Sequence, residues 1–208
     1  EASNLAVGYG GKAVVDYIDI EVRRGEAVAL VGPNGSGKTT ILKTLAGFLK
    51  PLSGSLKVSG KTFYAPQNPD FAFVKSSVEK ELIDVSKRSG IPLDRLRSAY
   101  PWLSSAARRS PYRLSHGQRR LLSLLIAYAF GRDIMLLDEP TTGLDANLYG
   151  GLVKMIAEAK SSGRAVVFST HDPRLVADAA DRVYLVESGR VKEVDKCAAL
   201  KLMGAEMW

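Results

Sequence analysis

The chain has 208 residues, 46% of them hydrophobic and 25% charged, which allows a substantial core and excludes a largely disordered chain. Its net charge of +7 suits a nucleotide, a nucleic acid or an anionic membrane as partner, without choosing among them. The longest apolar run, Leu121–Phe130, is too short for a membrane-spanning helix, which needs about 20 residues. A single cysteine, Cys197, excludes an internal disulfide. The first residues, which do not begin with Met, show no secretion signal.

The first third of the chain alternates β-type segments with glycine-containing turns. The expected strands are Asn4–Val7, Val14–Val22, Ala27–Val31, Ser55–Val58 and Thr62–Ala65. After the third of these the chain becomes rich in glycine, and an apolar helical pattern then runs from Thr40 to Phe48. A strand, a glycine-rich loop and a helix in this order are the context that a phosphate-binding loop requires.

The middle of the chain has a helical pattern. Ser77–Ser89 places its apolar residues on one face, and Ser115 fits the N-cap of a helix that runs to about Phe130. We therefore expect a helical subdomain over roughly 68–131, inserted in one α/β domain that spans 1–208. The last third is expected to alternate strands and helices over Ile134–Asp138, Ala146–Ser162, Ala165–Ser169, Pro173–Ala180 and Val183–Glu187. Such alternation predicts a parallel sheet.

The glycine-rich loop, Gly32–Thr39, matches the pattern G-x-x-x-x-G-K-[ST]. Its glycines let the backbone curl so that successive N–H groups face an anion, and the next helix adds its positive N-terminal end. Lys38 can reach the β- and γ-phosphates, and the Thr39 hydroxyl can ligate Mg²⁺. The alternative is a glycine-rich turn with an exposed lysine, which the flanking strand and helix disfavour. The loop residues expected to bind nucleotide are Asn34, Gly35, Ser36, Gly37, Lys38, Thr39 and Thr40.

Two carboxylates follow a second apolar strand, Ile134–Asp138. At the carboxyl edge of a parallel sheet they lie beside the phosphate loop. Asp138 can then hold the metal, directly or through water, and Glu139 can polarise a water aimed at the γ-phosphate. His171 follows the neighbouring expected strand and can hydrogen-bond the γ-phosphate and hold Glu139 in place. An exposed acidic turn and a structural histidine are the alternatives that the residues alone leave open.

Together these segments resemble the ATPase domain of the ATP-binding cassette (ABC) superfamily over nearly the whole chain. Gly32–Thr39 resembles the Walker A loop, and Met135–Glu139 resembles the Walker B strand with its catalytic glutamate. The other matches, in the family's order, are Tyr9 where an aromatic stacks on adenine, Gln67 of the Q-loop, Leu114–Gln118 of the signature, Gly143–Asp145 of the D-loop and His171 as the switch histidine. The resemblance implies an α/β fold: a P-loop NTPase core with a mainly parallel sheet, an N-terminal antiparallel β subdomain and an inserted helical subdomain.

In this family two ATPase domains face each other head to tail, and each ATP lies between the Walker A loop of one and the signature of the other. The resemblance therefore implies ATP and Mg²⁺ as cofactors and a second ATPase subunit, identical or related, as partner. The residues it implies are Ser115, His116, Gly117 and Gln118 for nucleotide contact, Thr39, Gln67 and Asp138 for the metal, and Glu139, His171 and Gln67 for catalysis. His116 departs from the pattern, because the signature usually has glycine there, and a side chain at that position can modify hydrolysis.

The segment Gln67–Asp70, QNPD, resembles energy-coupling-factor importers, and the histidine variant of the signature resembles that of related cobalt and nickel importers. These resemblances favour a subunit at the cytoplasmic face of the cell membrane that drives uptake of a vitamin or a transition-metal ion through integral-membrane subunits. Phe71, Phe73 and Val74 are candidates for the apolar side of the groove that accepts the membrane protein, or else fill the subdomain core.

Other functions remain as alternatives. A non-transport ABC ATPase acting on DNA fits the basic pairs Arg108-Arg109 and Arg119-Arg120, but the chain has no long coiled coil between Gln67 and the signature. We therefore expect no nucleic-acid partner, and we expect the basic pairs to lie on solvated helix faces or near anionic lipid. A translation factor of the same superfamily would carry two ATPase domains. A P-loop GTPase would carry an N-K-x-D segment, which this sequence lacks.

Overall fold

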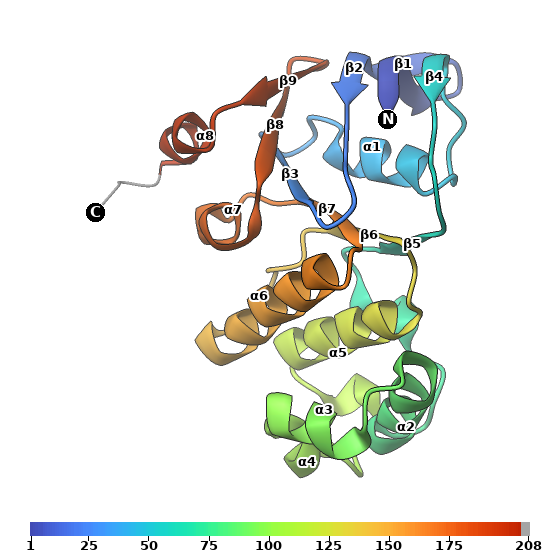
Figure 1. Cartoon of the computed structure of the whole chain (residues 1–208), viewed down its shortest axis with the longest axis vertical. Coiled ribbons are helices and arrows are strands. Elements are labelled where there is room, and N and C mark those ends of the chain that lie inside the picture. The colour runs from blue at the N-terminus through green and yellow to red at the C-terminus, as the bar shows by residue number, and fades with distance from the viewer. Residues whose placement is uncertain (205–208) are drawn as a thin grey trace.

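The computed structural model describes residues 1–204 and contains two sheets with helices between and below them (Figure 1). The smaller sheet is antiparallel, in the order β2-β1-β4. The larger sheet has the order β5-β6-β7-β3-β8-β9, and all its pairs are parallel except β8–β9. The strands are β1 (Ala2–Tyr9), β2 (Lys12–Ile20), β3 (Ala27–Val31), β4 (Ser53–Leu56), β5 (Thr62–Ala65), β6 (Ile134–Asp138), β7 (Ala165–Ser169), β8 (Arg182–Glu187) and β9 (Arg190–Val194).

Helices separate the sheets and cover the larger one. Helix α1 lies between the two sheets, α5 and α6 lie below the larger sheet, and α2, α3 and α4 form the end of the molecule farthest from the small sheet (Figure 1). The helices are α1 (Lys38–Leu45), α2 (Val78–Ser89), α3 (Leu93–Ala99), α4 (Trp102–Ala106), α5 (His116–Ala129), α6 (Ala146–Ser161), α7 (Pro173–Ala179) and α8 (Lys196–Leu202), with 3₁₀ turns η1 (Pro69–Ala72) and η2 (Pro111–Arg113). The fold class predicted from the sequence is confirmed.

Strand β3 separates two hydrophobic cores because successive side chains of a strand point to opposite faces. Ala29 and Val31 belong to the core shared with the helical layer below the sheet, which consists of α2 to α6. Val28 and Leu30 belong to the core shared with α1 and the small sheet. All residues of β3 are buried, which explains why this strand reads as a continuous apolar run.

The strands Ala27–Val31, Thr62–Ala65, Ile134–Asp138 and Ala165–Ser169 are as expected, whereas other boundaries differ. Strands β2 and β4 begin and end two residues earlier than predicted. Helix α1 ends at Leu45 rather than near Phe48, because Gly47 takes a φ of 82° that a right-handed helix does not allow. The last four residues of the predicted domain lie outside the described residues.

Helix α5 begins as predicted at Ser115, whose Oγ accepts a hydrogen bond from the Gln118 N–H at 3.2 Å. The Gln118 side chain accepts one from the Ser115 N–H at 3.2 Å, which completes a capping box. The prediction that Arg119 and Arg120 share a solvated helix face is wrong, because α5 is enclosed on nearly all sides and Arg120 is fully buried. Arg119, in contrast, forms an ion pair with Asp70 at 3.3 Å.

The three apolar candidates after Gln67 separate into two groups. Phe73 is buried in the main core, where its ring meets Tyr112 edge to face. Phe71 and Val74 are 79% and 78% exposed. Of the three candidates, Phe71 and Val74 are therefore the ones that present apolar surface to solvent.

Candidate functional site

The predicted phosphate loop connects β3 to α1, and two of its glycines are required by close packing. A Cβ on Gly37, whose φ is 106°, would lie 2.3 Å from Val15 Cγ2. A Cβ on Gly32 would lie 2.1 Å from the carbonyl oxygen of Val186. The loop is thus held against β2 and β8, and its backbone takes a conformation open to glycine alone. Ser36 Oγ is buried in this loop without a protein partner, as expected of a group that meets a ligand.

Lys38 begins α1 and folds back over the loop that precedes it. Its Nζ donates hydrogen bonds to the carbonyls of Gly32 at 2.7 Å and Pro33 at 3.0 Å. Burial lowers the pKa of Lys38, and the nearby charges of Glu139 and Asp138 oppose that shift. The loop therefore surrounds a cation before any phosphate arrives.

Asp138 ends β6 and is buried, and three hydroxyl groups donate hydrogen bonds to its carboxylate. They come from Thr39 at 3.1 Å, Tyr64 at 2.9 Å and Ser169 at 2.7 Å. Burial and the charge of Asp138 raise the pKa of Tyr64 well above its usual range. A hydroxyl and a carboxylate side by side are hard oxygen ligands, so Thr39 and Asp138 fit a magnesium ion.

Tyr64 and Ser169 were not predicted as site residues, and each lies on a strand next to β6. Tyr64 belongs to β5 and pairs in register with Leu136, while Ser169 belongs to β7 and pairs with Asp138 itself. Once the strand order is known, these positions can be deduced, because parallel neighbours bring their carboxyl ends together. The only signals for these two residues in the sequence were the strand pattern and the position of Tyr64 three residues before Gln67.

Glu139 lies directly after β6 with only 8% of its surface exposed. Its Oε2 is 2.8 Å from Nδ1 of His171, which follows β7. Its backbone N–H donates to Ser169 Oγ at 2.9 Å, and its φ of 48° lies in the left-handed region. The acidic side chain and the histidine thus meet above the phosphate loop from two adjacent strands, as expected.

A cavity of about 480 Å³ unites most of the predicted residues. Its lining consists of Tyr9, Val14, Asn34, Gly35, Ser36, Gly37, Lys38, Thr39, Thr40, Gln67, Glu139 and His171. Tyr9, 49% exposed, is available at its rim for a planar group. The volume suits a nucleotide-sized ligand.

The predicted signature residues do not line this cavity, and two of them, His116 and Gly117, instead pack against the predicted D-loop turn. A Cβ on Gly117 would lie 2.3 Å from the Gly143 carbonyl oxygen, so only glycine allows this approach. The His116 ring lies against the same turn, since a Cβ on Gly143 would lie 2.5 Å from His116 Cδ2. Ser115 and His116 are exposed. One copy of the chain therefore separates its phosphate loop from its signature.

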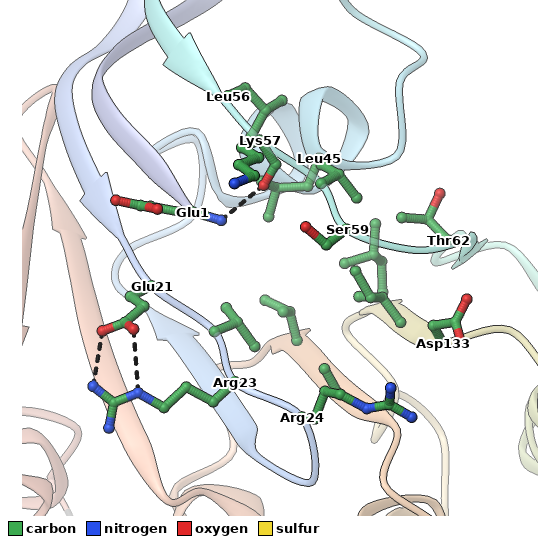
Figure 2. A pocket seen from close by; sticks show the side chains of 16 residues that line it. Glu1, Glu21, Arg23, Arg24, Leu45, Leu56, Lys57, Ser59, Thr62 and Asp133 are labelled. Atoms are coloured by element: carbon green, nitrogen blue, oxygen red, sulfur yellow. Dashed lines mark hydrogen bonds and ion pairs between the residues drawn. The ribbon is translucent and has the colours of Figure 1, made fainter.

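A second cavity, of about 400 Å³, lies at the opposite edge of the larger sheet, by the amino ends of β6 and β7 (Figure 2). Two interactions are formed within it: Glu21 pairs with Arg23 at 2.9 Å, and the amino group of Glu1 donates to the Lys57 carbonyl at 2.9 Å. None of the predicted site residues lines it. Within residues 1–204, no helix combines the length and apolar character needed to cross a bilayer.

Comparison with known proteins agrees with the geometry of the site. The family model described as ABC transporter matches residues 15–142, more than half of the chain. An ABC transporter ATP-binding protein of Methanosarcina mazei is 34% identical over 209 residues, which cover 91% of this chain and 42% of that protein. The energy-coupling factor transporter ATP-binding protein EcfA of Methanothermobacter thermautotrophicus is 30% identical over 213 residues, 92% of this chain and 68% of that protein.

The chain thus spans about two fifths of the M. mazei relative and about two thirds of the EcfA relative. A solved structure described as the ATP-binding subunit of an ABC transporter superposes with a TM-score of 0.78 at 24% identity. The superposition covers 99% of this chain and 93% of that one, and supports the fold. With the family model over the nucleotide-binding core, these matches identify the chain as a member of the ABC transporter family, carrying the ATP-binding domain with which that family hydrolyses ATP.

Proposed function

We propose that this chain is the ATP-binding subunit of an importer of the energy-coupling-factor type and hydrolyses ATP at a head-to-tail dimer interface. The observation that supports the proposal is the separation of the phosphate loop from the start of α5, the two places where we propose that the nucleotide binds. The phosphate loop, Glu139 and His171 share one cavity, while the exposed Ser115 at the start of α5 lies outside it. A second copy, or a related ATPase, would supply the missing signature to each nucleotide.

The proposal assigns the following roles to residues in and beside the cavity. Lys38 and the N–H groups of the loop bind the β- and γ-phosphates, and Tyr9 stacks on the adenine. Thr39, Asp138 and Gln67 would hold Mg²⁺, which supplies charge neutralisation at the phosphates. Glu139 takes the proton of the attacking water, and His171 orients the Glu139 carboxylate at 2.8 Å.

The triphosphate attracts the two copies because both the loop and the start of α5 bind anions. Hydrolysis removes this attraction, so the dimer opens and ATP binding energy becomes motion of the membrane subunits. The EcfA relative, the QNPD segment and the signature histidine support uptake of a vitamin or a transition-metal ion. We place the subunit at the cytoplasmic face of the membrane, with exposed Phe71 and Val74 toward the membrane partner.

Substitution of Glu139 tests this proposal. We expect Glu139→Gln to keep ATP affinity, to lose most turnover and to form a stable dimer with ATP, because the amide cannot accept the proton of water. Light scattering should show wild-type monomers without ATP and Glu139→Gln dimers with it. Normal turnover in this variant would refute the assignment of the base, and monomers at saturating ATP would refute the dimer.

A further inference from the structure

Arg120 is a charged side chain that the proposed mechanism does not use. It lies in α5, two residues after the signature, and is fully buried. Its guanidinium donates hydrogen bonds to the backbone carbonyls of Pro66 and Asp138, with a third contact to the Gln67 carbonyl at 3.4 Å. In the part of the chain that the structure describes, no carboxylate forms an ion pair with it.

Burying a cation without an ion pair costs free energy, and hydrogen bonds to the buried cation offset part of that cost. Burial lowers the pKa of Arg120 to about 10, although the charges of Asp138 and Glu139 oppose the shift. Arginine side chains stay charged at neutral pH. A charged donor makes stronger hydrogen bonds to carbonyl oxygens than a neutral one, so it can fix the backbone segments that it contacts.

One of these contacts fixes the backbone of Glu139. The Asp138 carbonyl and the Glu139 N–H belong to the same planar peptide unit. Arg120 donates to the oxygen of this peptide unit, while the Glu139 N–H of the same unit donates to Ser169 Oγ at 2.9 Å. The unit is thus held at both ends, where Glu139 takes a φ of 48° that residues with side chains disfavour. This conformation directs the Glu139 side chain into the cavity.

The other contact fixes the backbone of Gln67. The Pro66 carbonyl belongs to the peptide unit that ends at the Gln67 nitrogen, and it receives a hydrogen bond from the same guanidinium. Because the donors of one planar guanidinium have a fixed spacing, the two peptide units are kept at a fixed separation. Arg120 therefore joins the segment before the helical layer to the segment that carries Glu139.

We propose that Arg120 is a positioning residue for ATP hydrolysis: it clamps the Asp138–Glu139 peptide unit against Ser169 and ties it to the backbone of Gln67. This inference rests on the proposed function, because it assumes that Glu139 acts on the attacking water. It assigns Arg120 no contact with nucleotide. Loss of the clamp should affect the rate of hydrolysis and spare the affinity for ATP.

Two substitutions in the full chain test the clamp. Arg120→Met removes all donors at similar length, and Arg120→Lys keeps the charge with a single ammonium that cannot span both carbonyls. We expect kcat per folded protein to fall on the order of 10-fold to 100-fold in Arg120→Met and less in Arg120→Lys, as for a misplaced catalytic group. The Kd for ATP, measured with a fluorescent analogue, should stay within about twofold, since the phosphate loop is untouched.

Arg164→Met is the matched control, because Arg164 also donates to a backbone carbonyl, that of Tyr128, at 2.8 Å. It should lower stability without lowering kcat per folded protein. An Arg120→Met or Arg120→Lys protein with wild-type kcat would overturn the proposal, as would equal kcat losses in the control. If Arg120→Met does not fold, the Arg120→Lys result decides alone.

Amide hydrogen exchange gives a readout that needs no turnover. We expect faster exchange at the Glu139 amide in Arg120→Met than in wild type, because the peptide unit loses one of its two anchors. The same difference should appear in the Glu139→Gln background, at the amide of that position. Unchanged exchange at this amide would overturn the clamp even if the rate of hydrolysis fell. A wild-type protein that fails to hydrolyse ATP would instead refute the proposed function, and the exchange result would still stand.

Discussion

The hydroxyl of Tyr64 provides a sharp test of how the Asp138 carboxylate is held. Tyr64→Phe removes one oxygen and keeps the ring, so its edge-to-face contact with Phe48, at 5.7 Å between centroids, remains possible. A hydrogen bond to a charged group contributes about 1.5–3 kcal/mol. Asp138 keeps two other hydroxyl donors and Tyr64 is only half-buried, so we expect a loss of about 1–2 kcal/mol in the free energy of unfolding.

Urea unfolding near neutral pH, with EDTA present, measures this difference. Tyr112→Phe is the control. Tyr112 is 54% exposed and its hydroxyl is 3.5 Å from its acceptor, so this substitution should lower the free energy of unfolding by less than about 0.5 kcal/mol. A loss below 0.5 kcal/mol for Tyr64→Phe, or one equal to the control, would show that the hydroxyl does not stabilise the carboxylate.

The pH dependence of this difference follows from the raised pKa of Tyr64. The unfolded tyrosine titrates near pH 10, and the folded one at higher pH. The stabilising contribution is therefore fully present below about pH 10 and decreases as pH rises through the folded pKa. The difference in the free energy of unfolding between wild type and Tyr64→Phe should stay constant from neutral pH to about pH 9 and then decrease. A gap that widens above pH 10 would contradict the assigned hydrogen bond.

Three further predictions concern the loop and the signature. Lys38→Ala should lose ATP affinity by about 10-fold or more in a fluorescent-nucleotide titration, because the buried cation in the loop is removed; unchanged affinity would refute the phosphate-loop assignment. His116→Gly should leave the Kd for ATP within about twofold, since His116 does not line the cavity, and should change turnover; equal turnover would mean that the histidine is merely tolerated. Gly117→Ala should destabilise the fold by about 1–3 kcal/mol in thermal or urea unfolding, because its Cβ would meet the Gly143 carbonyl, whereas Gly150→Ala, with nothing within 4 Å, should be neutral or stabilising.

Local patterns in the sequence were sufficient to predict the loop, the acidic strand end and the capped start of α5. Each depends on neighbours along the chain: three spaced glycines before Lys38, two carboxylates at the end of an apolar strand, and Ser115 three residues before Gln118. These signals are strong because backbone conformation and capping are decided over a few residues. Strand β3 was likewise predictable, since a strand buried on both faces has few alternatives.

The residues that hold the acidic end of β6 became visible only through the order of the strands. Tyr64 and Ser169 come from opposite sides of β6 and are 105 positions apart in the chain, so no local pattern connects them. Arg120 was misjudged for a related reason, because a basic residue on a helix is usually solvated and only packing under the sheet makes it a buried donor. Local sequence patterns were enough to single out the side chains proposed to bind phosphate and activate water. The groups that hold those side chains depend on parallel strand order and helix packing, because these rest on contacts that are remote along the chain.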